Sequence, residues 1–167
     1  MEESLKDILT ARLRKDEMVA FLKKHPNKFE EVLNTALTDN QPEAWRAAWL
    51  LNHYMKENDQ RVKLQIKKII KVIPTKQDGH QRELLKILNK MELSEKQQGK
   101  LFDICLTIWE SIHKSPSVRG TAFMFLLKIS KKYPELRNEI VHLTQNHYTD
   151  TLSPGIKHSF NKIIEGL

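Results

Sequence analysis

Four basic residues recur along the chain at almost equal intervals, and this spacing limits the fold more than any other feature. Arg46, Arg82, Arg119 and Lys157 are separated by 36, 37 and 38 residues. Each stands just after the start of a predicted helix. A period near 37 residues is typical of helical-hairpin repeats, in which each unit exposes an apolar face that a neighbouring unit covers. The chain is therefore predicted to be a repeat protein.

Apolar residues fall at helical spacing through most of the chain. Val62, Ile66, Ile69 and Ile73 form one such stripe, which ends before Pro74. The longest stripe follows Ser94 and Gln97, whose spacing predicts a capping box at a helix start; its members are Leu101, Ile104, Cys105, Ile108, Trp109 and Ile112. Val and Thr are sparse beside Leu, Ile, Lys and Glu, so the composition favours helix over strand.

The order of these stripes predicts an all-α fold with eight main helices and short N-terminal pieces. We expect one domain over 1–167: a helical N-terminal cap over 1–25, then four antiparallel helix pairs over 26–167 stacked as a right-handed α-solenoid. A compact helical bundle is the alternative, because short loops and amphipathic helices give the same local pattern. The repeated register favours the solenoid.

The second helices of the predicted pairs carry the resemblance to a known class. Residues 42–51 and 116–127 resemble the second helix of a HEAT unit, the latter with Val118, Arg119 and Ala122 in a Val-Arg-x-x-Ala pattern. Gly79 stands where proline is expected in the corresponding helix. The chain is thus similar to HEAT-like or armadillo-like repeats. This resemblance implies that the second helices line the concave side of the stack.

Motifs for catalysis or cofactor binding are missing from the sequence. It contains no HExxH, paired CxxC, G-x-S-x-G, P-loop or G-x-G-x-x-G pattern. Cys105 lies on an apolar stripe and has no histidine at adjacent helical spacing, so core packing is the expected role. Trp45, Trp49 and Trp109 also stand at apolar packing positions. We therefore expect a protein that is not an enzyme and holds no cofactor and no metal.

The basic residues are the candidates for binding. The chain has a net charge of +7, and the predicted second helices hold most of the excess. The candidate binding residues are Arg46, Arg82, Lys86, Arg119 and Lys157. They could converge on a partner or on phosphates. In HEAT units, however, the arginine usually bonds to the neighbouring repeat, and this structural interpretation is favoured.

Two functions follow from these observations. The first is a non-enzymatic interaction module that binds a protein or peptide partner through its second-helix layer. The alternative is a nucleic-acid-binding α-solenoid with a basic groove, which resembles the HEAT-like alkylpurine DNA glycosylases in fold only. Lys63, Lys67, Lys68 and Lys71 form the densest cationic face, where solvation is the ordinary role and an anion contact is a secondary one.

Three features bear on where the protein works. No apolar run has the length of a membrane span, and the N-terminus lacks the continuous apolar stretch of a signal peptide. The single cysteine cannot form an internal disulfide. We expect a cytoplasmic protein with no membrane contact, and the sequence does not indicate its oligomeric state.

Overall fold

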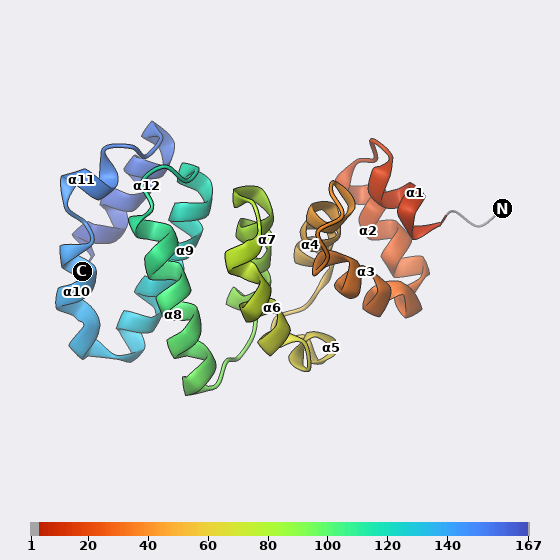
Figure 1. Ribbon diagram of the computed structural model, residues 1–167, viewed down its shortest axis with the longest axis horizontal. Helices are drawn as coiled ribbons and strands as arrows, with labels where there is room; N and C mark the ends of the chain where they lie inside the picture. The colour runs from red at the N-terminus through yellow and green to blue at the C-terminus, as the bar shows by residue number, and fades with distance from the viewer. Residues whose placement is uncertain (1–3, 167) are drawn as a thin grey trace. The chain divides into compact units, whose positions relative to one another are not determined.

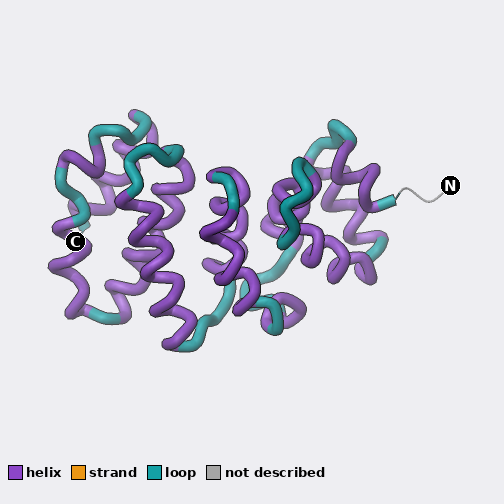
Figure 2. Tube along the Cα trace, in the orientation of Figure 1, coloured by secondary structure: helices purple, strands orange, loops and turns teal. Residues whose placement is uncertain are grey.

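The computed structural model describes residues 4–166, and all regular structure in this range is helical (Figures 1 and 2). The predicted all-α class is thus confirmed. The fold has two compact units, one ending at Glu92 and one beginning at Leu93. The single domain predicted over 1–167 stays a prediction.

The first unit contains seven α-helices joined by short connections. They are α1 (Leu5–Thr10), α2 (Lys15–Lys24), α3 (Phe29–Ala36), α4 (Glu43–Tyr54), α5 (Gln60–Lys63), α6 (Ile66–Val72) and α7 (Asp78–Asn89), with 3-10 turns at Pro26–Lys28 and Ile73–Thr75. Helix α4 lies at the centre and packs against α1, α2, α3 and α7. Its buried face includes Ala44, Ala47 and Ala48, whose small side chains let neighbouring helices approach closely.

The second unit contains five α-helices. They are α8 (Glu95–Glu110), α9 (Pro116–Lys132), α10 (Arg137–His142), α11 (Asn146–Thr149) and α12 (Pro154–Glu165), with a 3-10 turn at Pro134–Leu136. Helix α9 is central and packs against α8, α10 and α12. Trp109 on α8 is fully buried; its ring centre lies 4.6 Å from that of Phe123 and 5.1 Å from that of Phe160. These aromatic contacts anchor the core of the unit.

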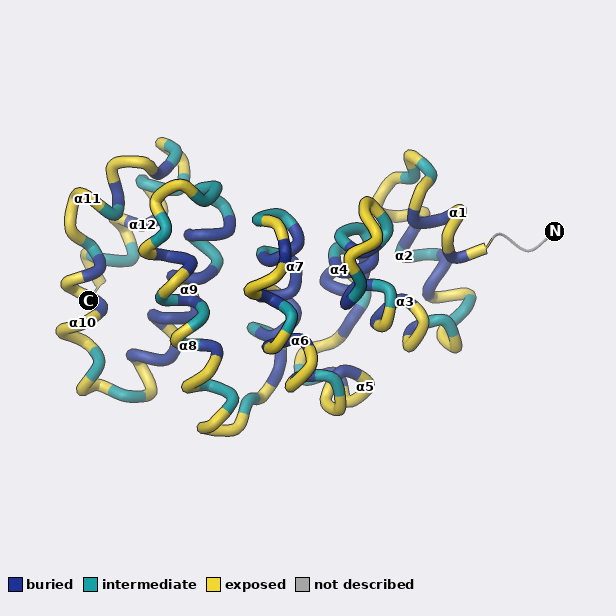
Figure 3. The backbone as a smooth tube through the Cα atoms, in the orientation of Figure 1, coloured by how far each residue is buried: buried dark blue, intermediate teal, exposed yellow. Residues whose placement is uncertain are grey.

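Burial follows the predicted stripes. Val62, Ile66, Ile69 and Ile73 are all buried, and the capping box between Ser94 and Gln97 is present. Figure 3 shows the buried positions gathered on α4 and α7 in one unit and on α8 and α9 in the other. Ile112 is an exception, since it lies beyond the end of α8 and is 38% exposed.

Two expected helices are interrupted. The apolar stripe from Val62 to Ile73 does not lie on one helix: α5 and α6 are separate, because the Gln65 N–H bonds to the Val62 carbonyl at 2.9 Å and tightens the chain there. The segment between Arg137 and Thr149 likewise forms two helices, α10 and α11, with a break between them. In that break the Thr144 hydroxyl donates to the Val141 carbonyl at 2.6 Å, a local bond that competes with the helical pattern.

Candidate functional site

Arg46 begins the series of recurring basic residues and joins α4 to the N-terminal helices. Its guanidinium donates through Nη1 to the carbonyl of Ala11, the residue that ends α1, and Nη2 lies 3.4 Å from the Met18 sulfur on α2. The side chain is half-buried. Arg46 therefore satisfies a free carbonyl at a helix end and fixes α1 and α2 against α4.

Arg119 is the corresponding residue of α9 and has no exposed surface. Nε donates to the Trp109 carbonyl at 2.9 Å, Nη1 to the Thr151 hydroxyl at 2.8 Å, and Nη2 to the Tyr148 carbonyl at 2.6 Å. Burial lowers the pKa of the Arg119 guanidinium. The buried charge is tolerated because three acceptors surround it. Its observed contacts hold α8, α9 and the α11 region in register.

Lys157 differs from both arginines because it lies near the surface. Its Nζ is 3.6 Å from a carboxylate oxygen of Asp150, and 43% of the side chain is exposed. An exposed pair of this kind holds the side chain only weakly. Lys157 thus keeps surface that a partner could reach, whereas Arg119 does not.

Arg82 and Lys86 are brought together on α7 by one buried acid. The Glu83 side chain is only 1% exposed, and its Oε1 accepts from Arg82 Nε at 3.0 Å and lies 3.6 Å from Lys86 Nζ. The Arg82 and Lys86 side chains are 29% and 47% exposed. A buried carboxylate therefore positions two cations at the surface of α7.

Asn52 on α4 joins Glu83 from the opposite helix. Its amide Nδ2 donates at 2.8 Å both to the Glu83 backbone carbonyl and to Glu83 Oε2. These two acceptors fix the orientation of the amide. Asn52 Oδ1 is left buried without a hydrogen-bond partner, which is a feature that calls for an explanation in a native fold.

A cavity of about 370 Å³ opens beside this pair, between α4 and α7. We call it the α4–α7 pocket. The residues that line it all carry polar or charged groups: Asn52, His53, Glu57, Glu83, Lys86, Asn89 and Lys90. Lys90 Nζ donates to the Asn52 backbone carbonyl at 2.5 Å. The pocket presents hydrogen-bond donors and acceptors, and both positive and negative side chains. It suits a ligand that has both donor and acceptor groups.

His53 stands at the exposed side of the α4–α7 pocket. Its ring meets Trp49 edge-on, with the ring centres 4.5 Å apart. Partial burial lowers the pKa of His53, and the positive charge of Lys15 acts in the same direction. His53 therefore stays neutral at pH 7 and presents one donor and one acceptor.

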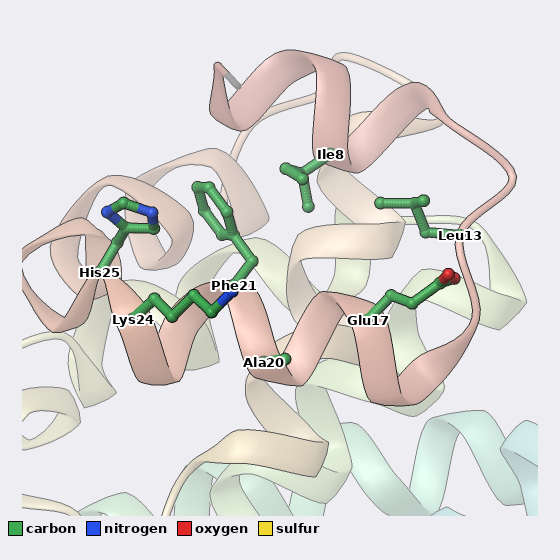
Figure 4. Close-up of a pocket in the computed structure, with 7 residues that line it drawn as sticks. All are labelled: Ile8, Leu13, Glu17, Ala20, Phe21, Lys24 and His25. Carbon is green, nitrogen blue, oxygen red and sulfur yellow. The ribbon is translucent and has the colours of Figure 1, made fainter. Parts of the chain in front are cut away.

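A second hollow of the first unit is lined largely by apolar side chains. Figure 4 shows the cavity of about 670 Å³ between α1 and α2, where Ile8 and Phe21 extend from the two helices into the intervening space. Glu17, on its rim, accepts from the Arg14 backbone N–H at 2.7 Å and so caps α2. Glu17 thus stabilises the start of α2, whereas the polar groups of the α4–α7 pocket converge on one space.

Neighbouring helices pack on each other, as α3 does on α4 and α8 on α9, and Arg46 and Arg119 donate to backbone carbonyls. These features are typical of a helical repeat. The family model described as HEAT repeat domain matches residues 1–167. The chain belongs to the HEAT repeat family. Comparison with curated proteins and with solved structures found no match. The family match confirms the resemblance seen in the second helices. HEAT repeats generally serve as scaffolds for protein interactions.

Sequence reasoning missed several residues of the site in this HEAT repeat chain. Asn52, His53, Glu83 and Lys90 were not among the predicted binding residues, whereas Arg82 and Lys86 were. A signal was present, because Glu83 stands one turn before Ile87 on the buried face of α7. A charged residue on an apolar stripe indicates a partner from another element.

The structure also places the residues considered for chemistry. Cys105 is fully buried, and burial raises the pKa of its thiol far above the usual range, so the nucleophilic thiolate is not formed. Among residues 4–166, no three His, Cys, Asp or Glu side chains gather in a group that could hold a metal ion. Within the same range, no helix is both long and apolar enough to cross a bilayer.

Proposed function

We propose that this HEAT repeat protein is a non-enzymatic interaction module that binds a protein or peptide partner through its second-helix layer. The α4–α7 pocket carries the proposal, because α4 and α7 are both second helices in the predicted pairing. The proposed architecture is the right-handed stack of four helix pairs, with this layer on the concave side. We place the module in the cytoplasm, in keeping with its single cysteine.

The residues of the pocket match the needs of a peptide. A peptide backbone supplies both N–H donors and carbonyl acceptors, and the pocket has cations at Lys86 and Lys90 and carboxylates at Glu57 and Glu83. Among the predicted binding residues, Lys86 lines the pocket, and Arg82 lies beside it through its bond to Glu83. Arg46 and Arg119 are engaged by backbone carbonyls, so a groove of free phosphate-binding arginines has little support.

Peptide selection tests this proposal. The purified protein is used to select binders from a displayed library of random peptides, and dissociation constants are measured for the wild type, His53→Ser and Lys86→Gln. We expect each substitution to weaken the selected peptides about tenfold. Lys100→Glu, at an exposed position of α8, is the control and should bind as the wild type does.

The outcome is decisive in either direction. Chemical-shift changes confined to α4 and α7 on adding a selected peptide support the proposed site. The proposal is wrong if selection yields no binder, or if selected peptides bind the two pocket variants and the wild type equally. Circular dichroism of each variant shows that its helices are retained.

A further inference from the structure

A basic surface that includes an exposed leucine lies on α5, α6 and the turn between them. We call it the Leu64 surface; it consists of Lys63, Leu64, Lys67, Lys68 and Lys71. Leu64 is 92% exposed, while the next most exposed large apolar side chain among residues 4–166, Met124, is 50% exposed. The four lysines are exposed as well. None of these residues belongs to the α4–α7 pocket.

The backbone places the Leu64 surface on one side of the chain. Leu64 and Gln65 keep right-handed helical dihedral angles between α5 and α6, so the chain keeps its right-handed winding although the α-helical hydrogen bonds are interrupted there. Leu64, Lys67, Lys68 and Lys71 then follow the i, i+3, i+4, i+7 spacing of one face. The opposite face, with Ile66, Ile69 and Ile70, is buried. The leucine and the lysines therefore point together into solvent.

The charge of this surface is not balanced locally. Residues 60–73 contain no Asp or Glu, and no carboxylate of the described chain lies within ion-pair distance of the four lysines. Arg61 is different: Asp59 Oδ2 lies 2.7 Å from its Nη2, and the guanidinium stacks 3.7 Å from the Phe29 ring centre. The contacts of Arg61 thus stabilise the fold. The lysines repel one another, and an anionic partner would relieve this repulsion.

We propose that the Leu64 surface binds an acidic amphipathic segment of a partner protein. Carboxylates of that segment pair with Lys67, Lys68 and Lys71, and its apolar side chains cover Leu64. Lysine suits this role because its ammonium is a flexible point charge that needs no fixed geometry in the partner. Burying Leu64 adds a hydrophobic contribution that charge alone lacks.

Leu64 also distinguishes this partner from other polyanions. A nucleic-acid backbone offers phosphates but no apolar group to cover the exposed Leu64. An anionic bilayer favours a wide apolar face on the inserted helix, and this face has a single leucine among lysines. An acidic segment with its own apolar side chains satisfies both parts of the surface.

A pair of labelled peptides tests this inference by fluorescence anisotropy. The first consists of Glu-Leu-Glu-Glu repeats, and the second replaces each leucine by glutamine at unchanged charge. We expect the leucine peptide to bind the wild-type protein about tenfold more tightly. Leu64→Ser should remove this preference and leave the glutamine peptide unaffected. Lys67→Glu combined with Lys68→Glu should weaken both peptides at least about tenfold.

Matched variants and competing probes complete the test. Val141→Ser removes another exposed apolar side chain, and Lys23→Glu with Lys24→Glu reverses two adjacent exposed lysines of α2; both should bind as the wild type does. The inference is overturned if the two peptides bind equally, or if Leu64→Ser leaves the preference intact. It is also overturned if single-stranded DNA or phosphatidylserine vesicles bind more tightly than the leucine peptide.

Discussion

Arg119 on α9 both stacks on Trp109 of α8 and bonds to its backbone: the guanidinium carbon lies 4.7 Å from the ring centre, and Nε donates to the carbonyl at 2.9 Å. The same arginine reaches the Tyr148 carbonyl with Nη2. One side chain thereby satisfies carbonyls from two other segments of the unit. Arg119, one of the recurring basic residues, thus holds neighbouring helices together.

Replacing Arg119 by methionine should destabilise the protein by about 3 kcal/mol, because buried carbonyls lose their donors. The measurement is chemical denaturation followed by circular dichroism. Lys157→Met is the matched control. Since Lys157 is 43% exposed and 3.6 Å from its acid, its loss should cost less than about 1 kcal/mol. Equal effects of the two substitutions would contradict the assignment.

Replacing Arg46 by methionine should loosen the N-terminal helices selectively. The Ala11 carbonyl loses its donor, and the expected cost is about 1 kcal/mol. Hydrogen exchange followed by mass spectrometry should show faster exchange in α1 and α2, with α8 and α9 unchanged. Uniform acceleration along the whole chain would argue against a local role.

Lys76 provides a test of a buried cation at a helix end. Its Nζ donates at 3.2 Å to the Leu37 carbonyl, at 2.8 Å to the Thr38 carbonyl and at 2.5 Å to Asp39. The side chain is 3% exposed, whereas that of Asp39 is 87% exposed. It therefore binds the free carbonyls that follow α3.

We expect Lys76→Met to destabilise the protein by about 2 kcal/mol, because two carbonyls lose their donor. Asp39→Asn should leave the free energy of unfolding almost unchanged, since that carboxylate is at the surface. Thermal and denaturant unfolding of both variants measure the difference. A larger loss for Asp39→Asn would show that the ion pair matters more than the carbonyls.

His80 should make stability depend on pH. Nε2–H donates to the Ala36 carbonyl at 2.7 Å, and Nδ1 accepts from the Gln41 amide at 3.0 Å. Gln41 Oε1 accepts from the Trp45 N–H at 3.3 Å, which fixes this amide. Neutral His80 fills both hydrogen bonds. Burial lowers the pKa of His80 in the folded protein, with a smaller contribution in the same direction from Lys76.

The direction of the pH dependence of stability follows from the lowered pKa of His80. Between the folded pKa and the unfolded value of 6.5, the unfolded chain binds more protons than the folded one. Stability is therefore fully present above pH 6.5 and decreases as the pH falls through the folded pKa. The urea concentration at the unfolding midpoint should decrease as the pH is lowered from about 7.5 to about 5.5. His80→Gln should reduce this dependence, and an unchanged dependence would assign it to another group such as His53.

Periodicity identified most helices correctly because it records which side of each helix is buried. The stripe from Val62 to Ile73 is buried, and Ser94 caps α8 through Gln97 as its spacing predicted. The breaks at Gln65 and Thr144 were missed, since each depends on a tighter turn or a hydroxyl bond that an apolar pattern does not reveal.

The site was harder to predict than the helices. Arg82 and Lys86 stand one turn apart on α7, and helical spacing suffices to place them together. Asn52 lies 31 residues from Glu83, and no local pattern pairs them. The exposure of Leu64 was likewise invisible in the sequence, because it depends on how the α5–α6 turn meets its neighbours.

The sequence by itself determined that this chain is a helical repeat protein with basic residues at a spacing near 37 residues, because amphipathic periodicity and repeat length are properties of neighbouring residues. The tertiary structure alone decided which of those cations face solvent. Arg46 and Arg119 bond to carbonyls 35 and 29 residues away, while 43% of the Lys157 side chain stays exposed. Hydrogen bonds over such separations exist only once the helices have packed.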